Sequence, residues 1–312
     1  MWTLAAGLAP VVVAAVYYFG PSAVLVISAS VLGAVGAEYA VGRPGSLRDG
    51  SATITGVLLG LTLPASMPMW MAFVGAAFGV GGGKALFGGL GSNVFNPALF
   101  GRAFLQAAFP AAITTWAVRG TRWWQLQGDN LALPFASPNT IHAVTSATPL
   151  GTMKFEHHVT PVWELMIGRT GGSLGETAGL VILVCGIWLA WRRVLDWRIP
   201  VAILATVSVL GQGLHALDAT RYPGALFQVF SGGLLLGAVF MATDPVTCPM
   251  PPMGRWIFGI GIGAIVILIR SWGGLPEGVM YAILLMNALT PALNHATQPR
   301  VFGMARRAEA PI

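Results

Sequence analysis

Apolar residues occur in long stretches along the chain, separated mostly by short polar segments. Ten such stretches stand out, and most approach the ~20 residues that a membrane-spanning helix needs. They cover Trp2–Phe19, Ser22–Val41, Thr53–Leu63, Met67–Gly82, Phe95–Val118, Leu174–Trp191, Ile199–Leu217, Gly224–Ala242, Trp256–Ile269 and Gly278–Ala296. The pattern predicts an all-α polytopic integral membrane protein of about ten transmembrane helices, forming a single transmembrane domain over residues 1–312.

The third stretch is too short for a full span, because it ends at Pro64 with Pro68 close behind. Broken helices of this kind usually line an interior site. Residues 56–64 also align with residues 237–245, and each copy is followed by an apolar span and a Gly-Gly-Leu sequence. Five spans per copy would give two inverted five-helix repeats, although chance similarity between glycine- and leucine-rich segments is the alternative.

Composition excludes several classes of protein. Hydrophobic residues make up 55% of the chain and charged residues 9%, against roughly 25% charged in soluble domains. The 17 lysines and arginines are too few to form the basic surface that binds nucleic acid. Cys185 and Cys248 are too few for an iron–sulfur cluster and are expected to serve packing. The histidines form no zinc-type cluster, so we expect no metal site.

One segment does not fit a membrane, and it sets the expected topology. Residues 119–173 carry several charges and four prolines, which predicts a soluble loop between the fifth and sixth spans. Ten basic residues lie on the side of the membrane opposite this loop. The side of this loop has two basic residues in its short loops and four in the loop itself. By the positive-inside rule both termini are cytoplasmic and the 119–173 loop is extracytoplasmic. The first span has no basic residue before it and is expected to be retained rather than cleaved.

Two glycine-rich segments resemble nucleotide-binding motifs without matching them. Residues 79–84 lack the spacing and the hydroxyl residue of a phosphate-binding loop. Gly259, Gly261 and Gly263 lie within an apolar stretch, where helix packing is the better interpretation. The adjacent histidines 157 and 158 are expected to be solvated. The chain alone therefore offers no catalytic residue set and no nicotinamide site.

The most informative segment for chemistry is residues 142–150, a turn rich in small and hydroxyl residues that Pro149 closes. On the residues alone, an ordinary loop is the main alternative. Ser146-Ala147-Thr148, preceded by Thr145, resembles the flavinylation motif of the RnfD/NqrB family of membrane subunits. That resemblance implies that Thr148 carries FMN through a phosphoester bond.

The resemblance extends over nearly the whole chain. It includes Ser46–Gly50, Lys84–Gly91, Asn93–Ala98, Gly101–Leu105, Phe240–Val246, Pro276–Gly278, Leu285–Asn287 and Pro299–Gly303. The sequence Ser-Ala-Thr-Pro-Leu at residues 146–150 and the compact length of the chain favour the Rnf branch of the family over the quinone-reductase branch. Two features depart from the family pattern: His142 stands where an aspartate is usual, and the basic N-terminal segment of the family is missing.

The family implies a redox subunit of a bacterial inner-membrane complex, an ion-translocating ferredoxin:NAD⁺ oxidoreductase. Its partners would include a second flavin subunit, iron–sulfur subunits and a flavin transferase for maturation. A second, non-covalent flavin (riboflavin or FMN) would lie deeper in the membrane. The alternatives are an NqrB-type subunit of a Na⁺-translocating NADH:quinone reductase, and a non-redox transporter or channel with inverted repeats.

Polar residues in the spans are candidates for the inner flavin site. Asn93 and Asn96 flank the start of the fifth stretch, and Arg102 lies about two turns further on. A membrane-buried arginine needs a ligand or a partner, and Glu38, Asp244 or a helix-end carbonyl could serve as the partner. Asp244 could bind Na⁺ or, slightly preferred, cap a helix. Glu38 is expected only to extend its carboxylate to the interface.

Overall fold

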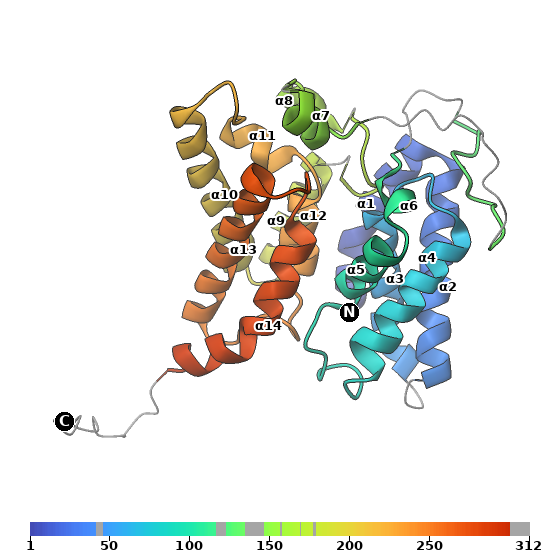
Figure 1. The fold of residues 1–312 in the computed structure, drawn as a ribbon. Helices are drawn as coiled ribbons and strands as arrows, with labels where there is room; N and C mark the ends of the chain where they lie inside the picture. Colours follow the sequence, from blue (N-terminus) through green and yellow to red (C-terminus); the bar gives the residue numbers. More distant parts are fainter. Residues whose placement is uncertain are drawn as a thin grey trace, which may run out of the picture.

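The computed structural model describes residues 1–41, 46–116, 123–134, 147–156, 158–168, 170–176 and 179–299. Within these ranges every regular element is a helix, apart from one isolated bridge between Pro64 and Ser173. Figure 1 shows the helices of the first half, from blue to teal, beside those of the second half, from yellow to red. The all-helical prediction is therefore confirmed for the part of the chain that the structure describes.

The helices follow the apolar stretches closely. The first half holds α1 (Trp2–Phe19), α2 (Pro21–Val41), α3 (Ser51–Thr62), α4 (Met69–Val80), α5 (Pro97–Ala108) and α6 (Pro110–Thr114). Two short helices, α7 (Pro149–Glu156) and α8 (Val162–Ile167), lie together at one end of the bundle (Figure 1). The second half holds α9 (Gly179–Trp191), α10 (Arg198–Leu217), α11 (Ala225–Phe230), α12 (Leu234–Leu236), α13 (Pro252–Trp272) and α14 (Val279–Thr297).

Four described helices, α1, α2, α10 and α13, are long and apolar enough to cross a membrane, and α3 and α9 are shorter apolar helices. These lengths agree with a multi-pass membrane protein. The count of ten spans and the boundaries of the 119–173 loop remain predictions.

Two of the predicted continuous spans are wrong. The stretch Phe95–Val118 breaks at Phe109, and Pro110 starts α6, because proline lacks the N–H that would continue the preceding helix. The stretch Gly224–Ala242 is divided at residues 231–233, where Gly232 has a φ of +66°. A π-helical segment, Gly237–Met241, then follows α12. The predicted break after α3 is confirmed, since that helix ends immediately before Leu63 and Pro64.

Glycine allows the spans to pack closely within each half. At Gly33 of α2, an added Cβ would collide with the carbonyl oxygen of Phe73 on α4. At Gly259 of α13, it would lie 2.6 Å from the Cβ of Ala202 on α10. Small residues at such contacts let helix backbones approach each other, so the expected packing role of the α13 glycines is confirmed.

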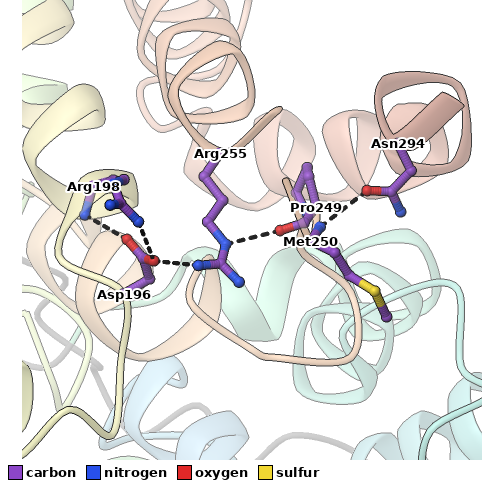
Figure 2. Close-up of polar contacts among 6 residues, drawn as sticks. All are labelled: Asp196, Arg198, Pro249, Met250, Arg255 and Asn294. Atoms are coloured by element: carbon purple, nitrogen blue, oxygen red, sulfur yellow. Dashed lines mark hydrogen bonds and ion pairs between the residues drawn. The ribbon is translucent and has the colours of Figure 1, made fainter. Parts of the chain in front are cut away.

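A polar network fixes one end of the second half (Figure 2). The Asp196 carboxylate accepts hydrogen bonds from the backbone N–H of Arg198 at the start of α10 and from the Arg255 guanidinium at the start of α13. Arg255 Nε also donates to the carbonyl oxygen of Pro249 at 3.0 Å, and Met250 N donates to Asn294 of α14. Three helix ends are therefore tied together at this level.

A buried ion pair holds the first half together, and it corrects one prediction. Glu38 does not reach the interface: it is 4% exposed, and its carboxylate lies 2.7 Å from Lys84 Nζ. Lys84 is 2% exposed, so it is not the loop cation that the topology count assumed. It lies in the π-helical segment Gly81–Ala85, which extends α4, and its ammonium also donates to Ser51 Oγ at 2.6 Å.

Removing one partner of this pair should destabilise the protein. Glu38→Gln leaves a buried ammonium without its counter-ion, and we expect a loss of about 3–5 kcal/mol in the free energy of unfolding. Replacing both partners by methionine should restore stability to near or above the wild-type value. Unfolding titrations of the purified protein would measure this, with exposed Glu164→Gln as the control. A Glu38→Gln protein as stable as this control would contradict the assignment.

Candidate functional site

Thr148 lies at the start of α7 and caps this helix. Its Oγ1 accepts a hydrogen bond from Gly151 N at 3.1 Å, and its carbonyl oxygen accepts one from Thr152 N at 2.9 Å. The local sequence explains the geometry, since threonine is favoured as a helix cap and proline at the first helical position. Thr148 remains partly exposed. His142, Thr145 and Ser146 lie outside the described residues.

Lys154 fixes α7 to the second half. Its Nζ lies within hydrogen-bond distance, 2.5–3.3 Å, of four carbonyl oxygens around the end of α13, which share its three N–H donors: those of Ile269, Arg270, Gly273 and Leu275. A cation is favoured at a helix C-terminus, where carbonyl groups lack partners. Partial burial lowers the pKa of Lys154 from its ordinary value. The contacts place α7 against the end of α13 in the second half.

A cavity of about 450 Å³ lies beside Thr148, and we call it the Thr148 cavity. Its walls come from both halves: α5, α6 and Trp116 on one side, and residues 275–281 around the start of α14 on the other. The lining includes three aromatic side chains, Trp116, Phe155 and Tyr281. Ligand sites commonly measure about 300–1,000 Å³ and combine apolar walls with few polar groups.

Arg102 lines the same cavity, so the structure brings together two residues that the sequence singled out separately. Its Nη2 lies 2.9 Å from Oε2 of Glu277, which directly precedes Gly278 and the start of α14. Arg102 is therefore paired, but with neither Glu38 nor Asp244. Glu277 Oε1 also accepts a hydrogen bond from Gly233 N at 2.7 Å.

The structure adds residues that the sequence argument did not single out. A Cβ at Gly233 would lie 2.6 Å from Glu277 Oε1 and 3.4 Å from Glu176 Oε1, so two carboxylates converge on this glycine. Arg270, which the topology count placed near a loop, is only 6% exposed within α13. Its guanidinium donates to the carbonyl oxygens of Gln228 and Ser231. Glu277 could have been found from the sequence, because it lies in the Pro276–Gly278 segment that carries part of the family resemblance.

Asn93 and Asn96 lie in a different place from Arg102. Both line a separate cavity of about 170 Å³. Asn96 caps α5 by accepting hydrogen bonds from the N–H groups of Ala98 and Leu99, and it donates to the carbonyl oxygen of Met241. Asn93 Nδ2 donates to Phe95 O, while its Oδ1 is buried without a partner among the described residues. The three predicted inner-site residues therefore do not form one site.

Asp244 also lines this smaller cavity, and its carboxylate stabilises a turn. It accepts hydrogen bonds from Val246 N at 3.2 Å and from the Thr247 hydroxyl at 3.3 Å. The prediction that Asp244 caps a helix is therefore wrong, because its carboxylate bonds within a turn and Pro251 occupies the N-cap of α13. No group of three or more metal-ligating side chains occurs among the residues with described placement.

The Thr148 cavity can accommodate the flavin group that the family resemblance implies. Thr148 Oγ1 would keep lone pairs after esterification, so the bond from Gly151 N could persist. The aromatic walls suit a flat ring system, and the Arg102 guanidinium offers donors for its carbonyl oxygens or its phosphate. The volume and the donor set therefore fit a flavin tethered at Thr148.

Comparison with known proteins places the chain in a family. The model of the NQR2, RnfD, RnfE family matches residues 1–303. A component of the ion-translocating oxidoreductase complex of Stutzerimonas stutzeri is 43% identical, over 93% of this chain and 88% of that protein. A component of the proton-translocating ferredoxin:NAD(+) oxidoreductase complex of Clostridium ljungdahlii is 38% identical, over 98% of this chain and 92% of that protein. The chain belongs to the NQR2, RnfD, RnfE family.

Proposed function

We propose that the chain is the membrane redox subunit of an Rnf-type ion-translocating ferredoxin:NAD⁺ oxidoreductase, and that it carries FMN on Thr148. It is one subunit of that enzyme rather than a complete enzyme. The observation that carries the proposal is the shared cavity of Thr148 and Arg102, in a chain whose relatives are named as components of such complexes. FMN, when bound, supplies the ability to pass electrons one at a time.

The residues of the chain have separate roles in this proposal. Thr148 Oγ1 would hold the FMN phosphate in a phosphoester. A flavin transferase would form this bond by breaking the diphosphate of a flavin dinucleotide, and the released nucleoside monophosphate would take the hydroxyl proton. Lys154 holds α7, and with it Thr148, against the end of α13. Arg102 provides positive charge at the cavity wall, and Glu277 keeps that guanidinium oriented through the 2.9 Å ion pair. The aromatic walls limit the access of water to the ring.

A second, non-covalent flavin fits the described residues less well. The cavity that Asn93 and Asn96 line has a volume of about 170 Å³, below the range of about 300–1,000 Å³ typical of ligand sites. We therefore propose no electron-transfer step through a flavin at these two residues.

The proposed architecture is ten spans in two inverted five-helix repeats, in a bacterial inner membrane. Helix packing supports it, because the same contacts recur in the two halves. The helix α2 packs along α4, as α10 packs along α13, and α4 contacts α5, as α13 contacts α14. The first helices of the two proposed repeats, α1 and α9, pack on each other. The Thr148 cavity then lies where the repeats meet.

The partners proposed for the chain are the other membrane and peripheral subunits of the complex, including flavin and iron–sulfur subunits. An NqrB-type role in a NADH:quinone reductase would use the same site with another electron acceptor. A transporter without redox function would need no hydroxyl residue for attachment at position 148.

The covalent flavin can be tested with a variant that preserves the helix cap. Thr148→Asn keeps a side-chain oxygen for Gly151 N but removes the hydroxyl group that the phosphoester needs. With the flavin transferase co-expressed, the wild-type band should fluoresce after denaturing electrophoresis and the Thr148→Asn band should not. Thr152→Val, one turn further along α7, should fluoresce as the wild type does. Fluorescence from Thr148→Asn would show that the flavin is attached elsewhere.

His142 offers a graded version of the same test. Restoring the usual aspartate with His142→Asp should leave flavin occupancy equal or higher, measured as fluorescence per mole of protein. A fall in occupancy would contradict the expected role of this position in attachment.

Arg102 should matter more for electron transfer than for membrane insertion. Arg102→Leu leaves the largely buried carboxylate of Glu277 without its ion-pair partner, so this single variant should also be less stable than the wild type. The double variant Arg102→Leu/Glu277→Leu removes both charges, so we expect wild-type assembly with slower flavin reduction. Stopped-flow reduction in the assembled complex measures the rate. A double variant that assembles and is reduced at the wild-type rate would leave Arg102 a purely structural role.

The proposed topology predicts where reporters become active. A reporter inserted within residues 125–140 should behave as extracytoplasmic, and one fused at the C-terminus as cytoplasmic. A cytoplasmic signal from the loop would overturn the ten-span arrangement.

A further inference from the structure

A larger cavity, of about 840 Å³, adjoins the Thr148 cavity and shares Phe155 and Pro276 with it. We call it the interfacial cavity. Its walls come from α7, from the loop between α10 and α11, and from the end of α13. The side chains that matter for its chemistry are Lys154, Asp218, Arg221, Tyr222, Arg270 and Trp272.

Positive charge predominates in this cavity, with three cationic side chains against one carboxylate. Among the described residues, none of Lys154, Arg221 and Arg270 has a carboxylate within ion-pair distance. Lys154 and Arg270 donate to backbone carbonyl oxygens instead. Arg221 lies over the Tyr222 ring, 5.5 Å from its centroid. The lining of the cavity therefore carries an excess of positive charge.

The carboxylates near these cations already have other partners. Asp218 accepts hydrogen bonds from the Thr220 hydroxyl and from the backbone N–H of Arg221, and these bonds hold the pKa of Asp218 below its ordinary value. Glu277, which lies near Arg270, accepts from Arg102 and from Gly233 N. The negative charge of Asp218 acts on Arg221, and those of Glu277 and Glu176 act on Arg270, so these carboxylates offset part of the positive charge. Lys154 contacts only carbonyl oxygens among the described residues.

The cavity lies at the depth of a membrane interface. Helices α10 and α13 have 20 and 21 residues, both are apolar enough to span, and they pack together. At 1.5 Å per residue they cover about 30 Å, the thickness of the hydrocarbon core. The Asp196 network marks one end of this pair of helices (Figure 2), and Leu217 and Trp272 mark the other end.

Aromatic side chains at the cavity support this depth. Trp272 is 61% exposed, and its ring centroid lies 6.4 Å from that of Tyr222. Tryptophan and tyrosine collect at the level of lipid headgroups because their rings are amphipathic. The cationic side chains of the interfacial cavity therefore lie where lipid phosphates lie.

We propose that the interfacial cavity binds the phosphate group of an anionic phospholipid. The Arg221 guanidinium, exposed at the rim, can form paired hydrogen bonds with phosphate oxygens. The Lys154 ammonium and Arg270 add positive charge from the cavity wall, and the lipid chains would extend along the apolar ends of α10 and α13. The site is separate from the proposed attachment of FMN and does not depend on it.

The test is native mass spectrometry of the full-length protein, delipidated and titrated with phosphatidylglycerol or with phosphatidylcholine. We expect wild-type protein to retain phosphatidylglycerol preferentially, and Arg221→Gln to weaken that binding about fivefold. Arg192→Gln is a matched control, because Arg192 also stacks over an aromatic ring, that of Trp188, away from the cavity. This control should bind the lipid as tightly as the wild type does.

Three outcomes would overturn the proposal. Equal binding of phosphatidylglycerol by Arg221→Gln and Arg192→Gln would show that the cavity does not hold the lipid. Displacement of the lipid by millimolar inorganic phosphate would assign the site to a free phosphate instead. Loss of the preference in the assembled complex, with a partner segment crosslinked to residue 221, would assign the surface to a protein contact. Because flavin enters none of these readouts, their result is independent of the fate of Thr148.

Discussion

The ion pair between Arg102 and Glu277 is the interaction on which the proposed redox site depends. An intramembrane arginine is tolerated only with a partner or ligand, and this partner lies 175 residues away in the sequence. The pair therefore joins α5 of the first half to the start of α14 in the second half. It also sets one wall of the Thr148 cavity, so the requirement to neutralise a buried charge shapes the cavity in which we place the flavin.

The helix α7 supplies the second element of the proposed site, the partly exposed Thr148 at its start. Thr148 caps this helix, and Lys154 fixes its other end to carbonyl groups that α13 leaves without partners. One short helix thus separates two cavities of different character. The Thr148 cavity has three aromatic side chains and one ion pair in its lining, whereas cationic side chains outnumber carboxylates in the lining of the interfacial cavity. Electron transfer and lipid anchoring would be adjacent but chemically distinct.

Much of the fold follows from the sequence, because helix position depends on local hydrophobicity. The bounds of α1 agree with its apolar stretch, and the break at Pro64 follows from proline chemistry. Pairings across the chain could not be predicted in this way. Neither the partner of Arg102 nor the burial of Lys84 against Glu38 has a local signature. Asn93 and Asn96, close to Arg102 in sequence, line another cavity because α5 separates them along its axis.

Peptide mapping by mass spectrometry tests the central claim most directly. Wild-type protein would be produced with its flavin transferase, denatured, digested and searched for an FMN adduct. The proposed function predicts one adduct, joined through phosphate to Thr148, with Thr145 and Ser146 unmodified. Intact protein of unmodified mass, or an adduct confined to another residue, would contradict the claim that the Thr148 cavity holds a covalently tethered flavin.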